Sequence, residues 1–478
     1  MVRPDSPVIV TQLVEGDKVN QKITFRSTPR HLRPTVRNGL VGATVLSLLA
    51  LGACAPGGQN IDSNAGGDIS MEVPSDEEIN LTLAHWEVGG NGEAIEALIA
   101  AYEEKHPNIT IDISFASFND YGQRIKLQMS DADAPDIAQA GQAFTMMGPL
   151  VEGGLLRPID DYAELYGWAD RFGPGLLDQA RFEADGSKFG TGDLYGLALG
   201  GNMVGVFYNR EVVDGLGIDP NFETLAEFDA ALAAAKAGGT IPLALGNADA
   251  WPANHLLSSL VSQTVDNEDM LAWIFGNEGA SFTADPFVEA AAHLEGWAAD
   301  GLIDSAANGL SFDDAIARFA AGDAAFFVTG NWALSTMQDQ MGDNVGFTAF
   351  PGTSADAPAR ATGATTSPFT ISAQTEYPDI AANFLDFMTG PDAAAILSNG
   401  GYAPLTPGSQ VAGDTQLIED YNAVWTRVLE DDGLTLFLDW STVAMGSTLF
   451  PGIQELLAGR ISAEDLTSSV QTEWENGR

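Results

Sequence analysis

Four tryptophans stand beside a carboxylate or an amide in segments predicted to be loops or helix starts. They are Trp86 before Glu87, Trp251 after Asn247 and Asp249, Trp332 after Asn331, and Trp440 after Asp439. A sugar presents flat faces of C–H groups with hydroxyls around the rim. A site for it therefore needs indole faces for the apolar side and carboxylate or amide groups for the hydroxyls. Each tryptophan alone is as readily a core residue, but four such pairs together favour a carbohydrate site.

Motifs for other chemistry are missing from the sequence. It has no GxxxxGK phosphate loop, no HExxH and no GxSxG. His85 falls on the apolar face of a predicted strand, where a hydrogen-bonded core histidine is expected rather than a catalytic one. The acids Asp131, Asp133 and Asp136 lack the glycine and the terminal glutamate of a calcium loop, so we interpret them as a solvated turn. We therefore predict no catalytic residue, no metal site and no cofactor.

The only cysteine, Cys54, ends an apolar run that begins at Leu40. Arginines precede the run, and the order cationic, apolar, small is that of a secretory signal. The run is shorter than the roughly 18 to 20 apolar residues that a spanning helix needs. Its end, Leu-Gly-Ala-Cys, resembles the lipobox of bacterial lipoproteins, which implies acylation of Cys54. We predict a signal peptide over 1–53 with an overlong start, and the alternative is a short anchor with an incidental cysteine.

The charge of the chain is strongly negative, with 21 Lys and Arg against 66 Asp and Glu and a formal net charge of −45. Such a surface repels nucleic acid and anionic lipid headgroups, so neither is an expected partner. The acid excess fits either a salty habitat or attraction of a cationic ligand. With 478 residues, 45% of them hydrophobic, the chain can form two domains or one two-lobed unit.

The predicted elements alternate between strands and helices after a flexible tether over 54–78. Apolar residues alternate over 79–85 and again over 109–115, and a helical stripe lies between them, which predicts a βαβ unit and a parallel sheet. The apolar run 195–209 is interrupted by glycines, and we expect the chain to pass there from one lobe to a second α/β series. A strand at 369–371 is expected to return to the first lobe.

Several longer strings carry a further signal. They are EAIEALIAAYEEKHPNITI at 93–111, APDIAQAG at 134–141, YGLALGGNMVGVFYNREV at 195–212, and AGDAAFFVTGNWALSTM at 321–337 followed by GDNVGFTAFPG. In their order and spacing they resemble the extracellular solute-binding proteins of ABC importers, specifically the carbohydrate-binding family 1 group related to maltose-binding proteins. The resemblance implies an α/β, two-lobed fold of the periplasmic-binding-protein type II, with hinge strands and a ligand cleft between the lobes. Its implied lobes are 79–201 with 356–408, and 202–355 with 409–478.

The resemblance also implies which residues contact the ligand. Carried over by position, they are Trp86, Glu87, Gln139, Gly141, Gln142, Asn202, Trp251, Asn331, Trp332, Thr365 in the turn Thr362–Thr366, Asp439 and Trp440. Relatives often carry an aromatic or acidic residue where this chain has Ala140 and Gly141. That wall of the pocket is therefore expected to be shallower, or the sugar to differ.

These observations predict a monomeric binding protein, not an enzyme, that is lipid-anchored on the extracytoplasmic face of a bacterial membrane. It would capture a mono- or oligosaccharide and deliver it to the transmembrane subunits of an ABC permease. One alternative is a secreted glycosidase with Glu87 and Asp439 as its two carboxylates, which would have to lie about 5 to 9.5 Å apart. A second alternative is a binding protein for a cationic ligand such as a polyamine.

Overall fold

The computed structural model describes residues 69–172, 175–405 and 414–477. They belong to the second of the two units into which the chain divides, residues 60–478. The predicted signal peptide, Cys54 and most of the predicted tether lie outside the described residues. Within the described ranges, no helix combines the length and the apolarity that crossing a membrane requires.

The first lobe is built on a sheet that has five strands among the described residues, in the order β2-β1-β3-β12-β6. Its strands are β1 (Ile79–His85), β2 (Ile109–Phe115), β3 (Ile137–Gln139), β6 (Gly196–Leu197) and β12 (Phe369–Ile371). Strands β2 and β3 both pair with β1 in parallel, and α1 (Gly89–Lys105) connects β1 to β2. The predicted βαβ unit is therefore confirmed.

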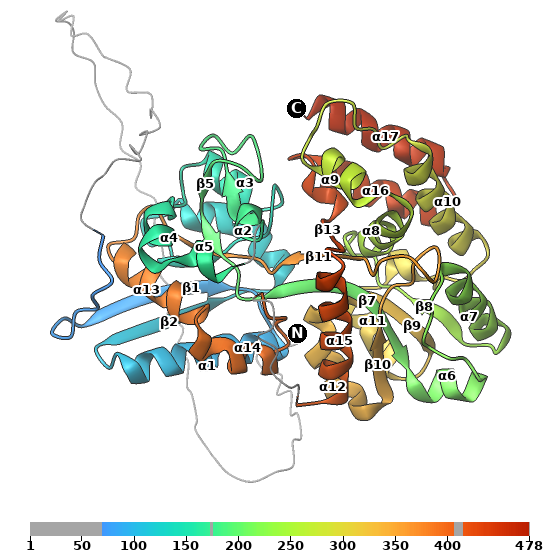
Figure 1. Cartoon of the computed structure of the whole chain (residues 1–478), viewed down its shortest axis with the longest axis horizontal. Coiled ribbons are helices and arrows are strands. Elements are labelled where there is room, and N and C mark those ends of the chain that lie inside the picture. Colours follow the sequence, from blue (N-terminus) through green and yellow to red (C-terminus); the bar gives the residue numbers. More distant parts are fainter. Residues whose placement is uncertain (1–68, 173–174, 406–413, 478) are drawn as a thin grey trace, which may run out of the picture. The chain divides into compact units, whose positions relative to one another are not determined.

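Helices cover this sheet (Figure 1). They are α2 (Phe118–Met129), α3 (Met147–Glu152), α4 (Asp160–Tyr166), α5 (Trp168–Arg171), α13 (Pro378–Met388) and α14 (Ala394–Asn399). Residues 142–146 form a turn, and the helix α3 begins only at Met147. This turn places Thr145 and Met146 beside the site described below.

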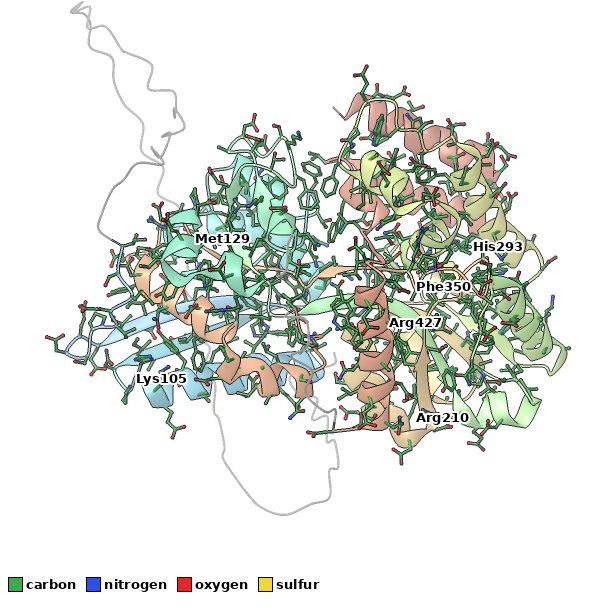
Figure 2. The ribbon with its side chains drawn as sticks, viewed as in Figure 1. Lys105, Met129, Arg210, His293, Phe350 and Arg427 are labelled. Carbon is green, nitrogen blue, oxygen red and sulfur yellow. The ribbon has the colours of Figure 1, made fainter. Side chains whose placement is uncertain are left out.

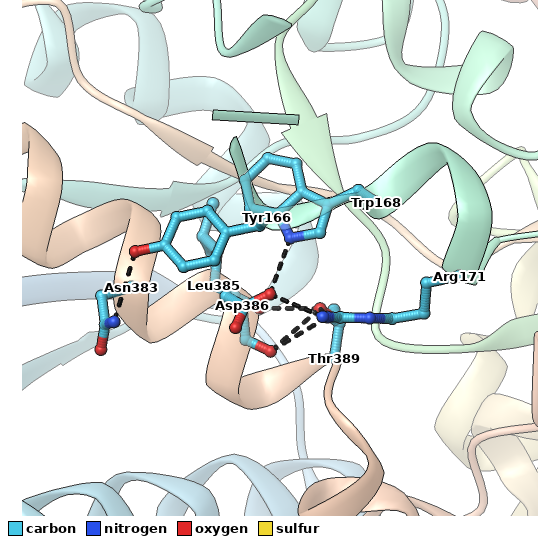
Figure 3. Close-up of polar contacts among 7 residues, drawn as sticks. All are labelled: Tyr166, Trp168, Arg171, Asn383, Leu385, Asp386 and Thr389. Atoms are coloured by element: carbon cyan, nitrogen blue, oxygen red, sulfur yellow. Dashed lines mark hydrogen bonds and ion pairs between the residues drawn. The ribbon is translucent and has the colours of Figure 1, made fainter. Parts of the chain in front are cut away.

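Asp386 of α13 fixes the position of α5 (Figure 3). Its carboxylate accepts hydrogen bonds from Trp168 Nε1 at 2.9 Å and from Arg171 Nη2 at 2.8 Å. The ring of Tyr166 stacks on that of Trp168 at 5.5 Å, and Asn383 donates to the Tyr166 hydroxyl. These contacts hold the helices of the first lobe together without involving the second.

The second lobe contains a larger sheet, with six strands among the described residues: β13-β11-β7-β9-β8, with β10 paired to β7. Its strands are β7 (Gly201–Asn209), β8 (Ile241–Ala244), β9 (Ala324–Gly330), β10 (Val345–Thr348), β11 (Ala361–Thr365) and β13 (Leu434–Thr435). Every residue of β7, β9 and β11 is buried, so this sheet forms the centre of the lobe.

Helices pack around the second sheet. They are α6 (Arg210–Leu216), α7 (Leu225–Ala237), α8 (Pro252–Thr264), α9 (Asn267–Ile274), α10 (Asp285–Ala299), α11 (Phe312–Ala320), α12 (Leu334–Met341), α15 (Gln416–Glu430), α16 (Met445–Leu457) and α17 (Ala463–Asn476). As its sequence predicts, α11 is capped by Ser311, whose side chain accepts from the Asp314 N–H. Polar contacts tie the helices: Arg210 Nη2 lies 2.8 Å from Asp420 in an ion pair, and His293 Nε2 lies within hydrogen-bond distance of Asp229, at 2.9 Å. Arg210 and His293 are labelled in Figure 2.

The chain passes between the lobes where the sequence predicts it. Strand β6 belongs to the first sheet and β7 to the second, and the connection contains Gly200 and Gly201. A Cβ at Gly201 would lie 2.2 Å from the Trp425 ring, so a side chain cannot fit there. The chain returns between β11 and β12. The predicted boundary at 355–356 placed β11 in the first lobe, whereas its pairing with β7 and β13 places it in the second.

Candidate ligand-binding site

The four predicted tryptophans belong to one series of ring contacts, which we call the aromatic network. It consists of Trp86, Phe118, Trp251, His255, Trp332, Phe437 and Trp440. From the first lobe, Trp86 contacts Phe118 at 5.5 Å between ring centroids, and Phe118 reaches Trp251 of the second lobe at 6.3 Å. The network therefore crosses from one lobe to the other.

His255 is the centre of the network on the second lobe. Its ring lies 5.1 Å from Trp251, 5.0 Å from Trp332 and 5.6 Å from Phe437. Phe437 in turn contacts Trp440 at 5.5 Å. Burial lowers the pKa of His255 to about 3, so the imidazole is neutral at physiological pH.

The positions of these residues follow from the topology. Trp86 follows β1, and Trp332 lies in the short 3-10 turn after β9. Trp251 is the N-cap of α8, the helix that follows β8, and Pro252 begins that helix. In open α/β sheets, ligands bind outside the carboxyl ends of the strands. The residues following β1, β8 and β9 gather at such ends.

Glu87 is held by amide groups of the first lobe. Gln139 Nε2 donates to Glu87 Oε1 at 2.6 Å, and Asn91 Nδ2 donates to Oε2 at 3.3 Å. Gln139 Oε1 also accepts from the Trp86 N–H at 3.4 Å. Burial raises the pKa of Glu87, while both hydrogen bonds act to lower it. The structure thus brings three of the predicted site residues, Trp86, Glu87 and Gln139, into direct contact.

Asp439 contacts both lobes. Its Oδ1 accepts from Asn254 Nδ2 of α8 at 2.7 Å, and the side chain of Thr145, from the first lobe, is a further hydrogen-bond partner. Burial raises the pKa of Asp439 to about 6, against the lowering effect of these hydrogen bonds. A cavity of about 380 Å³ adjoins the carboxylate, lined by Phe144, Thr145, Ala250, Asp439, Thr442, Val443, Gly446, Ser447, Phe450 and Pro451.

Three polar atoms of the aromatic network are buried without a hydrogen-bond partner among the described residues: Trp251 Nε1, His255 Nδ1 and Trp332 Nε1. Within the same ranges, His85 Nε2 and the Tyr402 hydroxyl are likewise unpaired. Buried polar groups are normally hydrogen-bonded. These unpaired atoms between apolar rings are therefore candidates for hydrogen bonds to the hydroxyls of a ligand.

Other predicted site residues already have partners in the segments that join the lobes. Asn331 Nδ2 donates to the carbonyls of Gly201 and Gly401 at 3.2 and 2.8 Å, and its Oδ1 accepts from the Met203 N–H. Asn202 accepts from the Ala364 N–H. Asn202 lies in the crossing strand β7, and Asn331 bonds to that strand from the turn after β9, so a direct contact with ligand stays a prediction for both.

Thr365 and Gln142 are bonded to each other across the same region. Gln142 Nε2 donates to the Thr365 carbonyl at 2.9 Å, and the Thr365 hydroxyl donates to Gln179 Oε1 at 3.1 Å. At Gly141, a Cβ would lie 3.1 Å from Met146 Cγ. Met146 therefore packs against Gly141, on the wall of the pocket where the sequence has small residues.

Sequence reasoning missed several residues of this region, including Phe118, Thr145, Asn254 and His255. A helical signal could have found His255, because it follows Trp251 by four residues and so lies one turn further along α8. Thr145 carries no such signal, because its contact with Asp439 joins positions almost 300 residues apart in the chain.

Comparison with known proteins agrees with this architecture. Residues 86–395 match the sequence model of the bacterial extracellular solute-binding proteins. An uncharacterised ABC transporter extracellular-binding protein of Pyrococcus horikoshii is 25% identical over 361 residues, covering 73% of this chain and 75% of the relative. The multiple sugar-binding protein of Streptococcus mutans is 24% identical over 370 residues, covering 73% and 78%.

Solved structures show the same fold. A chitin oligosaccharide binding protein aligns with a TM-score of 0.70 at 23% identity, covering 83% of this chain and 98% of that protein. A solute-binding protein solved in complex with raffinose aligns with a TM-score of 0.65 at 20% identity, covering 83% and 99%. The predicted two-lobed α/β fold is confirmed.

The sequence match identifies the class of protein, an extracytoplasmic solute-binding protein of the kind that serves ABC transporters. The family match covers well over half of the chain. The chain belongs to the bacterial extracellular solute-binding protein family.

Proposed function

We propose that this protein captures a neutral mono- or oligosaccharide between its lobes and delivers it to an ABC permease. The observation that carries the proposal is the aromatic network, which spans both lobes and contains the unpaired atoms Trp251 Nε1, His255 Nδ1 and Trp332 Nε1. Indole faces suit the C–H faces of a sugar, and buried donors suit its hydroxyls. The sugar-binding names of the Streptococcus mutans relative and of the solved structures support the same ligand class.

Ligand capture in this proposal is a shift between two arrangements of the lobes. A ligand favours the arrangement in which residues of both lobes touch it, because only there is its full binding energy realised. Trp86 and Glu87 belong to the first lobe, whereas Trp251, Trp332 and Asp439 belong to the second. The permease would then recognise the ligand-bound arrangement, and no bond of the ligand is broken.

The finer location is also a proposal: acylation of Cys54 anchors a monomeric protein, and residues 54–78 link it to the membrane. Two acyl chains or more would hold it stably, since each buried methylene contributes about 0.8 kcal/mol. Metabolic labelling with a fatty-acid analogue should mark the native protein and leave Cys54→Ser unlabelled. Equal labelling of both would contradict the anchor without affecting the binding proposal.

A thermal-shift panel tests the ligand class. Raffinose, chitotriose, xylotriose and D-galactose are added at millimolar concentration, and a sugar that binds only the folded state raises the melting temperature by a few degrees. The shift should shrink in Trp332→Phe, which keeps a ring but loses the unpaired N–H. Trp297→Phe is the matched control, because Trp297 packs within the second lobe and bonds to Asp229. Failure of every sugar in a broad neutral panel would refute the proposal.

A glycosidase is the second candidate, favoured by the two buried carboxylates with raised pKa values, Glu87 and Asp439. Against it, each carboxylate has its own set of amide or hydroxyl partners, and the family consists of binding proteins. Overnight incubation with the same oligosaccharides distinguishes the two. Turnover that Glu87→Gln abolishes would establish hydrolysis and defeat the transport proposal.

A further inference from the structure

A short hairpin of the first lobe reaches the second lobe beside the site. Strands β4 (Arg181–Phe182) and β5 (Asp193–Leu194) form its base. The Glu183 N–H donates to the Lys188 carbonyl at 3.0 Å, and the Gly190 N–H donates to the Arg181 carbonyl at 3.0 Å. The hairpin therefore has its own internal hydrogen bonds.

The hairpin is also fixed to the rest of the first lobe. Arg181 pairs with Asp160 at 2.8 Å, and the same carboxylate accepts from the Leu194 N–H. At Gly186, which has a φ of 70°, a Cβ would lie 2.7 Å from the Gly148 carbonyl oxygen. The loop thus lies directly on α3, and its position is set before it meets the other lobe.

Phe189 is the residue of this hairpin that joins the lobes. On its own lobe it contacts Phe182 at 5.5 Å and Phe144 at 6.4 Å. On the second lobe it stacks on Phe275 at 5.7 Å with 22° between the rings, and it meets Trp440 edge-on at 5.9 Å. Only 4% of Phe189 is exposed, whereas Phe275 at the end of α9 is 38% exposed.

We propose that Phe189 is a positioning residue for ligand binding, which stabilises the arrangement of touching lobes and holds Trp440 in place through an aromatic contact outside the proposed sugar contacts. Moving the lobes apart would break the contacts with Phe275 and Trp440 and expose a phenylalanine that is now buried. The contacts with Phe182 and Phe144 would survive, because they lie within one lobe. Phe189 therefore favours the arrangement in which the two lobes touch, even before a ligand binds.

The first experiment needs no sugar. Small-angle X-ray scattering of the ligand-free protein should give a larger radius of gyration for Phe275→Ala than for the native protein, because one closing contact is lost. Phe189→Ala should show the same change. Since Phe189 is buried, the partly exposed Phe275 provides the variant that keeps its fold if Phe189→Ala does not. Phe222→Ala is the matched control, because its ring contacts, Phe228 and Phe326, lie in the second lobe alone.

The second experiment rests on the proposed function and uses whichever of raffinose, chitotriose, xylotriose or D-galactose gives the largest thermal shift. Phe189→Ala removes both aromatic contacts to the second lobe, so it should weaken affinity about tenfold. The loss should appear in the dissociation rate, because a bound ligand leaves when the lobes part and weaker contacts between them let them part more often. The double variant with Phe275→Ala should lose less than the sum of the single losses, since the two rings share one contact.

The outcomes separate the two proposals. An unchanged radius of gyration in both ligand-free variants would overturn the role of Phe189, whatever the sugar results. A change there together with no response to any sugar would support Phe189 and refute the proposed function. Equal losses of affinity in Phe189→Ala and the control Phe222→Ala would mean general destabilisation and would also overturn the role of Phe189.

Discussion

Asp439→Asn should make the ligand-free protein more stable at neutral pH. Burial raises the pKa of this carboxyl from 3.8 to about 6, although Asn254 and Thr145 bond to it. The folded protein therefore binds the proton more tightly than the unfolded chain does. The stability that comes from the proton is fully present below pH 3.8 and is lost as the pH rises through 6. An asparagine has no charge to bury at any pH.

The size of the effect follows from the same values. Each pKa unit corresponds to about 1.4 kcal/mol, so ionised Asp439 costs the folded state about 3 kcal/mol at pH 7 and about 0.5 kcal/mol at pH 4. Asp439→Asn should recover up to those amounts, since its carbonyl oxygen can still accept from Asn254. The same variant should bind sugar more weakly, because a charged acceptor forms stronger hydrogen bonds to hydroxyls than a neutral amide does.

Urea unfolding at pH 4, 5.5 and 7 measures this difference, with the variant compared with the native protein at each pH so that effects of the other acids cancel. Asp356→Asn is the matched control, because it removes an acid from an exposed position. The reasoning is refuted if Asp439→Asn changes the free energy of unfolding equally at pH 4 and pH 7. It is also refuted if the exposed control shows the same pH dependence.

Three further predictions concern the aromatic network, the first lobe and the ligand's charge. His255→Phe keeps the ring contacts but removes Nδ1, so sugar affinity measured by calorimetry should fall about tenfold while the melting temperature stays the same or rises; unchanged affinity would show that Nδ1 meets no ligand. Asp386→Ala removes the acceptor shared by Trp168 and Arg171 and should cost about 2 kcal/mol in urea unfolding without changing sugar affinity; a parallel loss of affinity would contradict the separation of this contact from the site. Sugar affinity should stay within about twofold between 0.05 and 0.5 M NaCl, because a neutral ligand has no charge to screen; a steep fall would indicate a cationic ligand.

The sequence predicted the local elements well, and the reason lies in periodicity. The alternation over 79–85 and 109–115 indicates two strands, and a helix is the usual connection between parallel strands, which β1 and β2 are. The sequence also allowed the tryptophans to be grouped into one predicted site. Three of them follow β1, β8 and β9, and ligands of open α/β sheets bind outside the carboxyl ends of the strands.

What the sequence did not reveal depends on pairing between distant segments. The predicted boundary between the lobes at 355–356 lies before β11, but which sheet receives β11 is decided by its contacts with β7 and β13. The sequence also does not reveal that the side-chain amide of Asn331 bonds to backbone groups of Gly201, Met203 and Gly401. The spacing of residues within one segment does not show which distant segment a side chain will contact.

The segments that join the lobes are bonded to one another. The Thr366 N–H donates to the Gly200 carbonyl at 2.7 Å, and the Gly201 N–H donates to the Ala403 carbonyl at 2.8 Å. Because these three stretches of backbone are hydrogen-bonded side by side, we expect them to act as one hinge, which permits rotation of the lobes about a single axis and resists translation or twisting. We therefore expect the lobes to open and close along one reproducible path. A transporter would then encounter two conformations of the protein, one with the lobes apart and one with the lobes in contact.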